Sequence, residues 1–239
     1  MDIERTILIT GAGRGLGRAM AAHLAAPGTL LLLHHSASAQ GAEDTLAMVE
    51  EKGGAGALLP ADFADPDARK KLIAAVKNHT DHLNCVIHNA GIFDEKPLLE
   101  ITPEHWNKVM EVNLNAVFEL TTGLLPLIRA SGHGRFIAIG DSGADRVIAR
   151  NKSTAYHVSK LGLSVLVRSF ASTLGGEGIG FNQISPGYLE NSVGKPEKPI
   201  PAGRAGRFAD VLGALDYLLS PQADYVNGAN IVVSGGWNL

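Results

Sequence analysis

Short, almost continuously apolar runs alternate with longer amphipathic segments along the whole chain. Seven runs have the pattern of strands, at residues 6–10, 29–34, 55–59, 85–88, 135–139, 179–184 and 229–233. Most lack polar alternation, as expected for strands buried on both faces. Helical periodicity fills the segments between them, at 14–26, 42–52, 67–78, 103–130, 154–174 and 210–219. This alternation predicts one doubly wound α/β domain over residues 1–239, with a parallel seven-stranded sheet and helices on both faces.

The composition favours a folded protein and argues against disordered, nucleic-acid-binding and membrane-spanning ones. The chain is 45% hydrophobic, which is enough to bury a core, and its net charge of −3 argues against a nucleic-acid-binding face. No apolar run has the length of a membrane span, and the charged start gives no sign of a signal peptide. Cys85 is the only cysteine, which favours a reducing cytoplasm.

Residues 191–207 interrupt the alternation after the sixth predicted strand. The segment contains Pro196, Pro199 and Pro201 and has no periodicity of its own. It follows the carboxyl end of a strand, where ligands bind in doubly wound sheets. We expect it to cover the substrate as a lid, with a solvated loop as the alternative.

A glycine-rich turn joins the first predicted strand to the first helix. It comprises Gly11, Gly13, Arg14, Gly15, Leu16 and Gly17. Glycines let backbone N–H groups approach a pyrophosphate, and the following helix N-terminus adds partial positive charge. The spacing differs from the G-x-G-x-x-G fingerprint, so the position of the turn is the stronger indication of dinucleotide binding.

The end of the second predicted strand favours NADP(H) over NAD(H). An acidic residue there would bind the ribose hydroxyls of NAD and repel a 2′-phosphate. The sequence instead has His34, His35 and Ser36, with no acid before Glu43, and Arg14 can reach the same space. Alternatively, the histidines simply end the strand and the arginine is solvated. After the third strand, Asp62 and Phe63 are candidates for adenine contacts, although Asp62 could equally cap a turn.

Several motifs occur in an order that resembles the short-chain dehydrogenase/reductase family in its single-domain form. After the glycine-rich turn and Asp62 come Asn89-Ala90-Gly91, Asn113, Ser142, Tyr156-His157-Val158-Ser159-Lys160 and Pro186-Gly187. Each motif alone is weak, whereas the joint order is specific. The resemblance covers essentially the whole chain. It implies hydride transfer between NADP(H) and a carbonyl or alcohol substrate, with a 3-oxoacyl-thioester reductase-like branch first.

The resemblance implies a role for each polar residue of the set. Tyr156 would protonate the carbonyl oxygen, and Ser142 would bind that oxygen. Lys160 lies four residues after Tyr156, on the same helix face, where its ammonium should lower the phenol pKa. Lys160 would also hold the nicotinamide ribose, and Asn113 would support a water that links Lys160 to solvent.

Small residues after two other strands would pass close to the coenzyme. By resemblance, Ala90 and Gly91 pack against it while Asn89 braces the sheet. Pro186 and Gly187 would lie near the nicotinamide amide.

The sequence departs from the family pattern in two places. The catalytic serine usually precedes the tyrosine by about 13 residues, but Gly143 stands there and Ser142 lies one residue earlier. We expect Ser142 to face Tyr156 and Asp141 to point away, since neighbours on an extended chain alternate. Asp141 is the alternative, and with Asp145 it keeps a pteridine-reductase-like enzyme open. The usual threonine after Pro-Gly is absent, and Ser192 is a possible substitute.

Other features favour a soluble enzyme acting on a small molecule. His79 and His82 lack a third ligand at metal spacing, so we expect no metal site. We expect a small-molecule carbonyl substrate, no nucleic-acid or membrane partner, and a homo-oligomer, either tetramer or dimer, because the helices at 103–130 and 154–174 are apolar on more than one face. A dinucleotide-binding sensor without catalysis is the rival class, which has no need for a proton donor such as Tyr156.

Overall fold

The computed structural model describes residues 2–143, 146–192, 196 and 198–237. Within these residues, seven strands form one parallel sheet in the order β3-β2-β1-β4-β5-β6-β7. The strands are β1 (Arg5–Ile9), β2 (Thr29–His35), β3 (Ala55–Pro60), β4 (Cys85–His88), β5 (Arg135–Ile139), β6 (Gly180–Pro186) and β7 (Asn230–Val233). The predicted doubly wound α/β fold is therefore confirmed.

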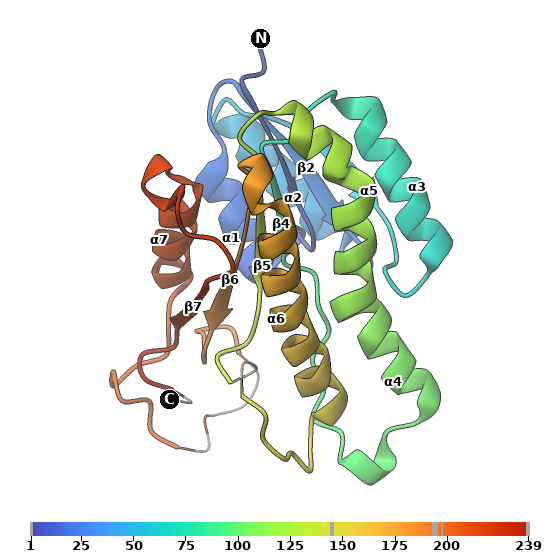
Figure 1. The fold of residues 1–239 in the computed structure, drawn as a ribbon, viewed down its shortest axis with the longest axis vertical. Helices are drawn as coiled ribbons and strands as arrows, with labels where there is room; N and C mark the ends of the chain where they lie inside the picture. The colour runs from blue at the N-terminus through green and yellow to red at the C-terminus, as the bar shows by residue number, and fades with distance from the viewer. Residues whose placement is uncertain (1, 144–145, 193–195, 197, 238–239) are drawn as a thin grey trace.

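Helices cover both faces of the sheet (Figure 1). They are α1 (Gly15–Leu24), α2 (Ala39–Glu51), α3 (Pro66–His79), α4 (Pro103–Met110), α5 (Ala116–Ala130), α6 (Thr154–Leu174) and α7 (Phe208–Leu219). Short helical turns occur at Leu98–Glu100, Gly175–Glu177 and Pro221–Ala223. Helices α1, α2 and α7 lie on one face, and α3, α4, α5 and α6 lie on the other.

Alternate residues of each central strand enter different cores. Ile7 and Ile9 of β1 pack with α1 and α7, whereas Leu8 packs with α3, α5 and α6. All three side chains are fully buried. A strand that is covered on both sides needs apolar residues at every position, which explains the continuous runs in the sequence.

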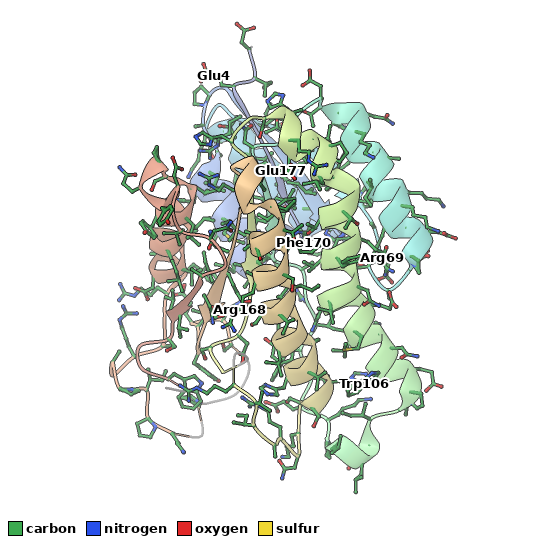
Figure 2. All side chains as sticks on the ribbon, viewed as in Figure 1. Glu4, Arg69, Trp106, Arg168, Phe170 and Glu177 are labelled. Atoms are coloured by element: carbon green, nitrogen blue, oxygen red, sulfur yellow. The ribbon has the colours of Figure 1, made fainter. Side chains whose placement is uncertain are left out.

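The segment predicted as one helix at 103–130 contains an irregular turn. A π-helical stretch, Glu111–Asn115, separates α4 from α5. Arg69 of α3 is held against this stretch and α5 by ion pairs to Glu111 and Glu119, both at 2.7 Å. Figure 2 labels Arg69 between α3 and α5. The irregular turn carries Asn113, one of the predicted site residues.

The strand order reverses between β1 and β4, the two strands at the centre of the sheet. Chain connections leave this point in opposite directions, which opens a crevice at the carboxyl ends of the strands. The glycine-rich turn follows β1, and the Asn89-Ala90-Gly91 motif follows β4. The fold thus brings these two predicted motifs together.

Candidate active site

The glycine-rich turn packs tightly against the segment after β4. A Cβ on Gly17 would lie 2.1 Å from the Gly11 carbonyl oxygen, and one on Gly11 would lie 3.0 Å from the Ala90 Cα. Gly11 also has a φ of +68°, a conformation that favours glycine. These contacts explain why Gly11 and Gly17 are glycines, and they place the α1 N-terminus beside the segment after β4. A compact turn leading into a helix N-terminus fits a pyrophosphate.

Thr10 and Asn89 hold the two halves of this arrangement. The Thr10 hydroxyl accepts hydrogen bonds from the backbone N–H groups of Asn89 and Ala90, both at 2.9 Å. The Asn89 amide donates to the carbonyls of Thr10 (2.9 Å) and Gly11 (3.2 Å). Asn89 therefore braces β1 against β4 in this structure. The part played by Thr10 was missed from sequence, because a threonine at a strand end gives no distinctive pattern.

The predicted NADP(H) set comes from the end of β2 and from the glycine-rich turn, and two of its four residues lie at the surface. Ser36 and Arg14 are exposed, whereas His35 is buried and its Nδ1 lies 3.2 Å from the Ser36 carbonyl. A Cβ on Gly13 would lie 3.2 Å from the Ser38 hydroxyl, so the α2 N-terminus adjoins the glycine-rich turn. Ser38 is a further hydroxyl in this space that the sequence pattern did not single out.

His34, the residue before them, is buried and connects three segments. Its Nδ1 accepts the Gly11 N–H (3.1 Å), and its Nε2 lies 3.1 Å from the Ala61 carbonyl. The ring stacks on Phe63 at 4.0 Å. Burial lowers the pKa of His34 to about 4, so the ring is neutral near pH 7. His34 thus positions the turn and the segment after β3.

The side chains of Asp62 and Phe63 differ in their exposure to solvent. The Asp62 side chain is exposed and accepts the Ala64 N–H at 3.0 Å, which forms a local turn. The Phe63 side chain is buried beneath His34. Any contact between Phe63 and an adenine ring would therefore involve its backbone.

Lys160 and Asn113 meet beside Gly91. A Cβ on Gly91 would lie 3.4 Å from Asn113 Oδ1 and 3.7 Å from Lys160 Nζ. Asn113 is buried, and its amide pairs with the backbone N–H and carbonyl of Ile92 at 2.9 and 3.0 Å. It also donates to the Ser159 hydroxyl at 3.0 Å. The π-helical turn aims Asn113 at α6, consistent with the frequent occurrence of such turns at functional sites.

Tyr156 and Lys160 share one face of α6. Lys160 Nζ lies 5.8 Å from the centre of the Tyr156 ring and donates to the Ile139 carbonyl at 2.7 Å. The Phe93 and Tyr156 rings pack edge to face, with 4.9 Å between their centres. Their spacing in the sequence predicted this shared face.

The pKa of Tyr156 shifts in the direction opposite to our expectation. Burial raises it, the Asp141 carboxylate raises it further, and Arg150 lowers it. Burial lowers the pKa of Lys160 to about 8, with Asp141 opposing that change. We expected the ammonium to lower the phenol pKa, but desolvation is the larger effect in the chain alone. The phenol is therefore protonated near pH 7.

Ser142 and Asp141 both lie at the site. The Ser142 hydroxyl is buried without a hydrogen-bond partner among the described residues, and its N–H donates to Pro186 at 3.1 Å. Asp141 accepts the Gly143 N–H at 3.3 Å and acts electrostatically on Tyr156 and Lys160. Whether the Asp141 side chain points away from Tyr156 therefore stays a prediction, and so does the role of Ser142. Asp145 lies outside the described residues.

The segment after β6 lies against β7 and the glycine-rich turn. Gly187 leaves no room for a side chain, because a Cβ would lie 2.7 Å from that of Ser234. The Ser192 hydroxyl accepts the Leu189 N–H at 3.0 Å, and Asn191 approaches within 3.1 Å of the Cβ position of Gly15. No sequence pattern indicated Asn191. Residues 193–195 and 197 of the predicted lid lie outside the described residues. In the remainder, the Ala202 N–H donates to the Gly235 carbonyl, just after β7, at 2.9 Å.

Two negative findings apply to the described residues alone. No helix there is long and apolar enough to cross a membrane. In the same ranges, no group of three or more His, Cys, Asp and Glu side chains could hold a metal ion.

Comparisons with known proteins match nearly the whole chain. A family model described as enoyl-(acyl carrier protein) reductase matches residues 11–238. The L-rhamnose 1-dehydrogenase (NAD(P)(+)) of Azotobacter vinelandii is 32% identical, over 98% of this chain and 96% of its own length. The 3-oxoacyl-[acyl-carrier-protein] reductase FabG of Escherichia coli is 29% identical, over 99% and 98%. The structure of the angucycline C-6 ketoreductase LanV with bound NADP superposes with a TM-score of 0.89 at 29% identity, covering 99% of this chain and 96% of that one.

Proposed function

The chain belongs to the short-chain dehydrogenase/reductase family, and we propose that it reduces a ketone to a secondary alcohol with NADPH. It is an oxidoreductase that transfers a hydride between a nicotinamide dinucleotide and a carbonyl or alcohol substrate. The identity of the dinucleotide, the direction and the residue roles are the proposal. The observation that carries it is the arrangement of Lys160, which lies beside Asn113 at Gly91 and 5.8 Å from the centre of the Tyr156 ring.

The residues at the crevice fit a dinucleotide. Gly11, Gly13 and Gly17 leave no space for side chains where the turn meets its neighbours, and α1 begins within the same turn, at Gly15. We assign the pyrophosphate to the turn from Gly11 to Gly17 and the adenine to the segment at Asp62 and Phe63. The Asn89-Ala90-Gly91 segment and Pro186-Gly187 would line the nicotinamide end. The bound nicotinamide supplies the hydride.

Each polar side chain of the site then has its own role in the proton transfer. Tyr156 donates its phenol proton to the carbonyl oxygen while the carbonyl carbon accepts the hydride, which yields the alcohol and leaves the oxidised coenzyme. Ser142, buried without a partner among the described residues, holds the same oxygen. Lys160 binds the ribose and stabilises the resulting phenolate. The phenol pKa is raised, so Tyr156 is protonated near neutral pH, as the proton donor of a reduction has to be.

The NADP(H) preference rests on the surface beside the α2 N-terminus. Arg14 is exposed and makes no ion pair among the described residues, and the hydroxyls of Ser36 and Ser38 lie in the segment that adjoins it. The first acids of α2 are Glu43, which is exposed, and Asp44, which pairs with Arg18 at 3.5 Å. An arginine beside hydroxyl groups suits a 2′-phosphate.

Titrating the purified protein with NADPH and NADH tests the cofactor assignment. We expect tighter NADPH binding, and Arg14→Ala should weaken NADPH by roughly ten- to a hundredfold, the value of one charge-assisted hydrogen bond. Lys77→Ala, which removes an exposed cation of α3, is the control. Equal affinities in the unmodified protein would contradict the NADP(H) preference.

A substrate panel tests the reaction itself. Ketones, 3-oxoacyl thioesters and dihydropterins are mixed with the protein and NADPH, and coenzyme oxidation is followed. We place 3-oxoacyl thioesters first. Dihydropterins are the second candidate, because Asp141 acts on both Tyr156 and Lys160. Tight NADPH binding with no turnover of any carbonyl compound would favour the sensor alternative.

We further propose one domain with residues 191–207 as a substrate lid, assembled into a homo-oligomer in the cytoplasm. The exposed side chains of Phe118 on α5 and Val165 on α6 support the assembly. Cys85, buried and unpaired, supports a reducing compartment.

A further inference from the structure

A cavity lies at the amino edge of the sheet, at the end opposite the coenzyme crevice. Its volume is about 170 Å³, and it is lined by the first residues of β1, β4 and β5 and by the chain that leaves α7. Arg5 begins β1, whereas the glycine-rich turn follows the other end of the same five-residue strand. A strand of that length spans about 16 Å, so the cavity is separate from the proposed site of hydride transfer.

The register of the sheet brings two arginines to one wall of this cavity. Ile7 pairs with Cys85 of β4, and Cys85 pairs with Arg135 of β5. Residues paired across neighbouring strands point to the same face, and Arg5 shares the face of Ile7 because it lies two positions earlier. Ile7 and Cys85 belong to the core that includes α7. Arg5 and Arg135 therefore lie on the α7 face, two strand spacings or about 10 Å apart across the sheet.

Arg135 has its partners within the protein. Its side chain is 10% exposed and pairs with Asp224, and its Nη1 donates to the carbonyls of Gly134 (3.2 Å) and Gly178 (3.3 Å). Asp224 is the only carboxylate among the described residues that line the cavity, and the exposed His133 ring lies 4.0 Å from it. The charge of Asp224 is thus matched by that of Arg135.

Arg5 is the cation that remains. Its Nε is buried without a hydrogen-bond partner, and its guanidinium forms no ion pair in the part of the chain that the structure describes. The adjacent acid, Glu4, lies against Gly28 instead, 3.5 Å from its Cβ position. Cys85 supplies no negative charge, because burial raises the pKa of its thiol to about 12, although both arginines oppose that rise. Folded proteins rarely leave a buried polar group unpaired, so Arg5 needs an explanation.

The remaining walls of the cavity restrict the kind of molecule that could pair with Arg5. Ile7, Leu219 and Pro221 supply apolar surface. A cavity of about 150 Å³ holds a molecule the size of benzene. A guanidinium matches the two oxygens of a carboxylate with two parallel hydrogen bonds. The cavity thus suits a small molecule with a carboxylate at one end and a short apolar chain at the other.

We propose that this cavity binds a short aliphatic carboxylic acid, with its carboxylate on Arg5 and its chain against Leu219 and Pro221. The site goes beyond the proposed reductase function, because none of its lining residues belongs to the crevice at the carboxyl ends of the strands. It binds its ligand without any chemical step.

Calorimetric titration of the protein without coenzyme tests the site. Butyrate is compared with butyramide, which has a similar shape and no charge. We expect butyrate to bind roughly ten- to a hundredfold more tightly, as for one charge-assisted contact. Acetate should bind more weakly than butyrate, because it covers less of the apolar wall. Inorganic phosphate that binds as tightly as butyrate would show that the apolar wall has no role, and would overturn the assignment to a carboxylic acid.

Variants of two arginines locate the bound butyrate. Arg5→Gln should remove the preference for butyrate over butyramide, and Arg5→Lys should retain part of it. Arg168→Gln removes an exposed charge from α6, where Figure 2 labels it, and should keep the preference. A cooperative urea transition checks that each variant is folded. An unchanged preference in both Arg5 variants would overturn the site.

Tyr156→Phe separates this site from the proposed catalytic one. The variant should bind butyrate as the unmodified protein does, since Tyr156 is at the other end of the sheet. Loss of butyrate binding in Tyr156→Phe would place the ligand in the catalytic site and overturn the inference. The absence of any carbonyl reduction would contradict the proposed function alone, because the titrations need neither coenzyme nor turnover.

Discussion

The phenol of Tyr156 is the group on which the chemistry depends. It shares a helix face with Lys160, lies beneath Phe93 and is protonated near pH 7 because burial raises its pKa. Tyr156→Phe keeps the ring and its packing but removes the proton donor. We expect turnover to fall by roughly 10²–10⁴-fold, the usual value of general acid catalysis. NADPH affinity, measured by titration of the same variant, should stay within about a factor of two. A variant with a tenth or more of the original rate would contradict the assignment.

Asp141 acts electrostatically on Tyr156 and Lys160, after burial the largest influence on their pKa values. Its carboxylate raises the pKa of Lys160, which burial has lowered to about 8. Lys160 loses its proton as the pH rises through that value, so kcat/KM should decline above about pH 8. Asp141→Asn removes the charge that opposes this loss. The declining limb should then move to lower pH, by roughly one unit at the effective dielectric of a protein site.

The control for this pH profile is Asp81→Asn, an equal charge change at an exposed residue after α3. Its declining limb should coincide with that of the unmodified protein. If the decline of kcat/KM stays at the same pH in Asp141→Asn, or moves to higher pH, then Asp141 does not raise the pKa of Lys160.

Among single residues, the sequence predicted the neighbours that lie close along the chain. It did not predict contacts between residues that only the fold brings together. Tyr156 and Lys160 are one helical turn apart, so their shared face followed from the spacing. His34 joins Gly11 to Ala61 across segments that are distant in sequence, and no local pattern reveals that. Our expectation that the Tyr156 pKa is lowered was wrong: burial raises this pKa, and burial cannot be read from the local sequence.

Among the elements, the β1–α1 connection has the least tolerance for a side chain. A Cβ on Gly17 would lie 2.1 Å from the Gly11 carbonyl oxygen and 2.7 Å from Asn89 Nδ2. Gly17→Ala therefore has to separate β1, α1 and the segment after β4. We expect it to lower the free energy of unfolding by about 1–3 kcal/mol, as overpacking does. It should also weaken NADPH binding, since the turn is displaced.

Gly213 offers a matched control in α7. Nothing lies within 4 Å of its Cβ position. Alanine there should raise the free energy of unfolding by about 0.5–1 kcal/mol, because glycine is a poor helix former. Urea denaturation of both variants compares the two effects directly. Equal stability of Gly17→Ala and Gly213→Ala would show that the turn can absorb a side chain.

The elements themselves followed closely from the hydrophobic pattern. Strands β4 and β5 and helix α6 begin and end where their apolar runs predicted. The π-helical turn at Glu111–Asn115 did not, because its residues have ordinary helical periodicity. Its irregularity depends on Asn113 pairing with Ile92 and on Arg69 binding Glu111 from α3, which are contacts between distant segments.

The molecule as a whole leaves an apolar surface on the outer side of α5 and α6. Phe118 is 49% exposed and Val165 is 58% exposed, and the Phe118 ring stacks on Phe170 at 6.1 Å. Figure 2 shows Phe170 on α6, facing the neighbouring helix α5. Two long helices side by side, each apolar beyond the face that covers the sheet, are typical of a surface that binds another protein.

We expect this surface to bind a second copy of the chain within a tetramer. Light scattering at micromolar concentration should give the mass of four chains, and Phe118→Glu combined with Val165→Glu should reduce it to half or less, because each charge would be buried without a partner. Met48→Glu places the same charge at an exposed apolar residue of α2 and should leave the mass unchanged. A monomer in the unmodified protein would refute the assembly. A tetramer that survives the double change would assign its contacts to another surface.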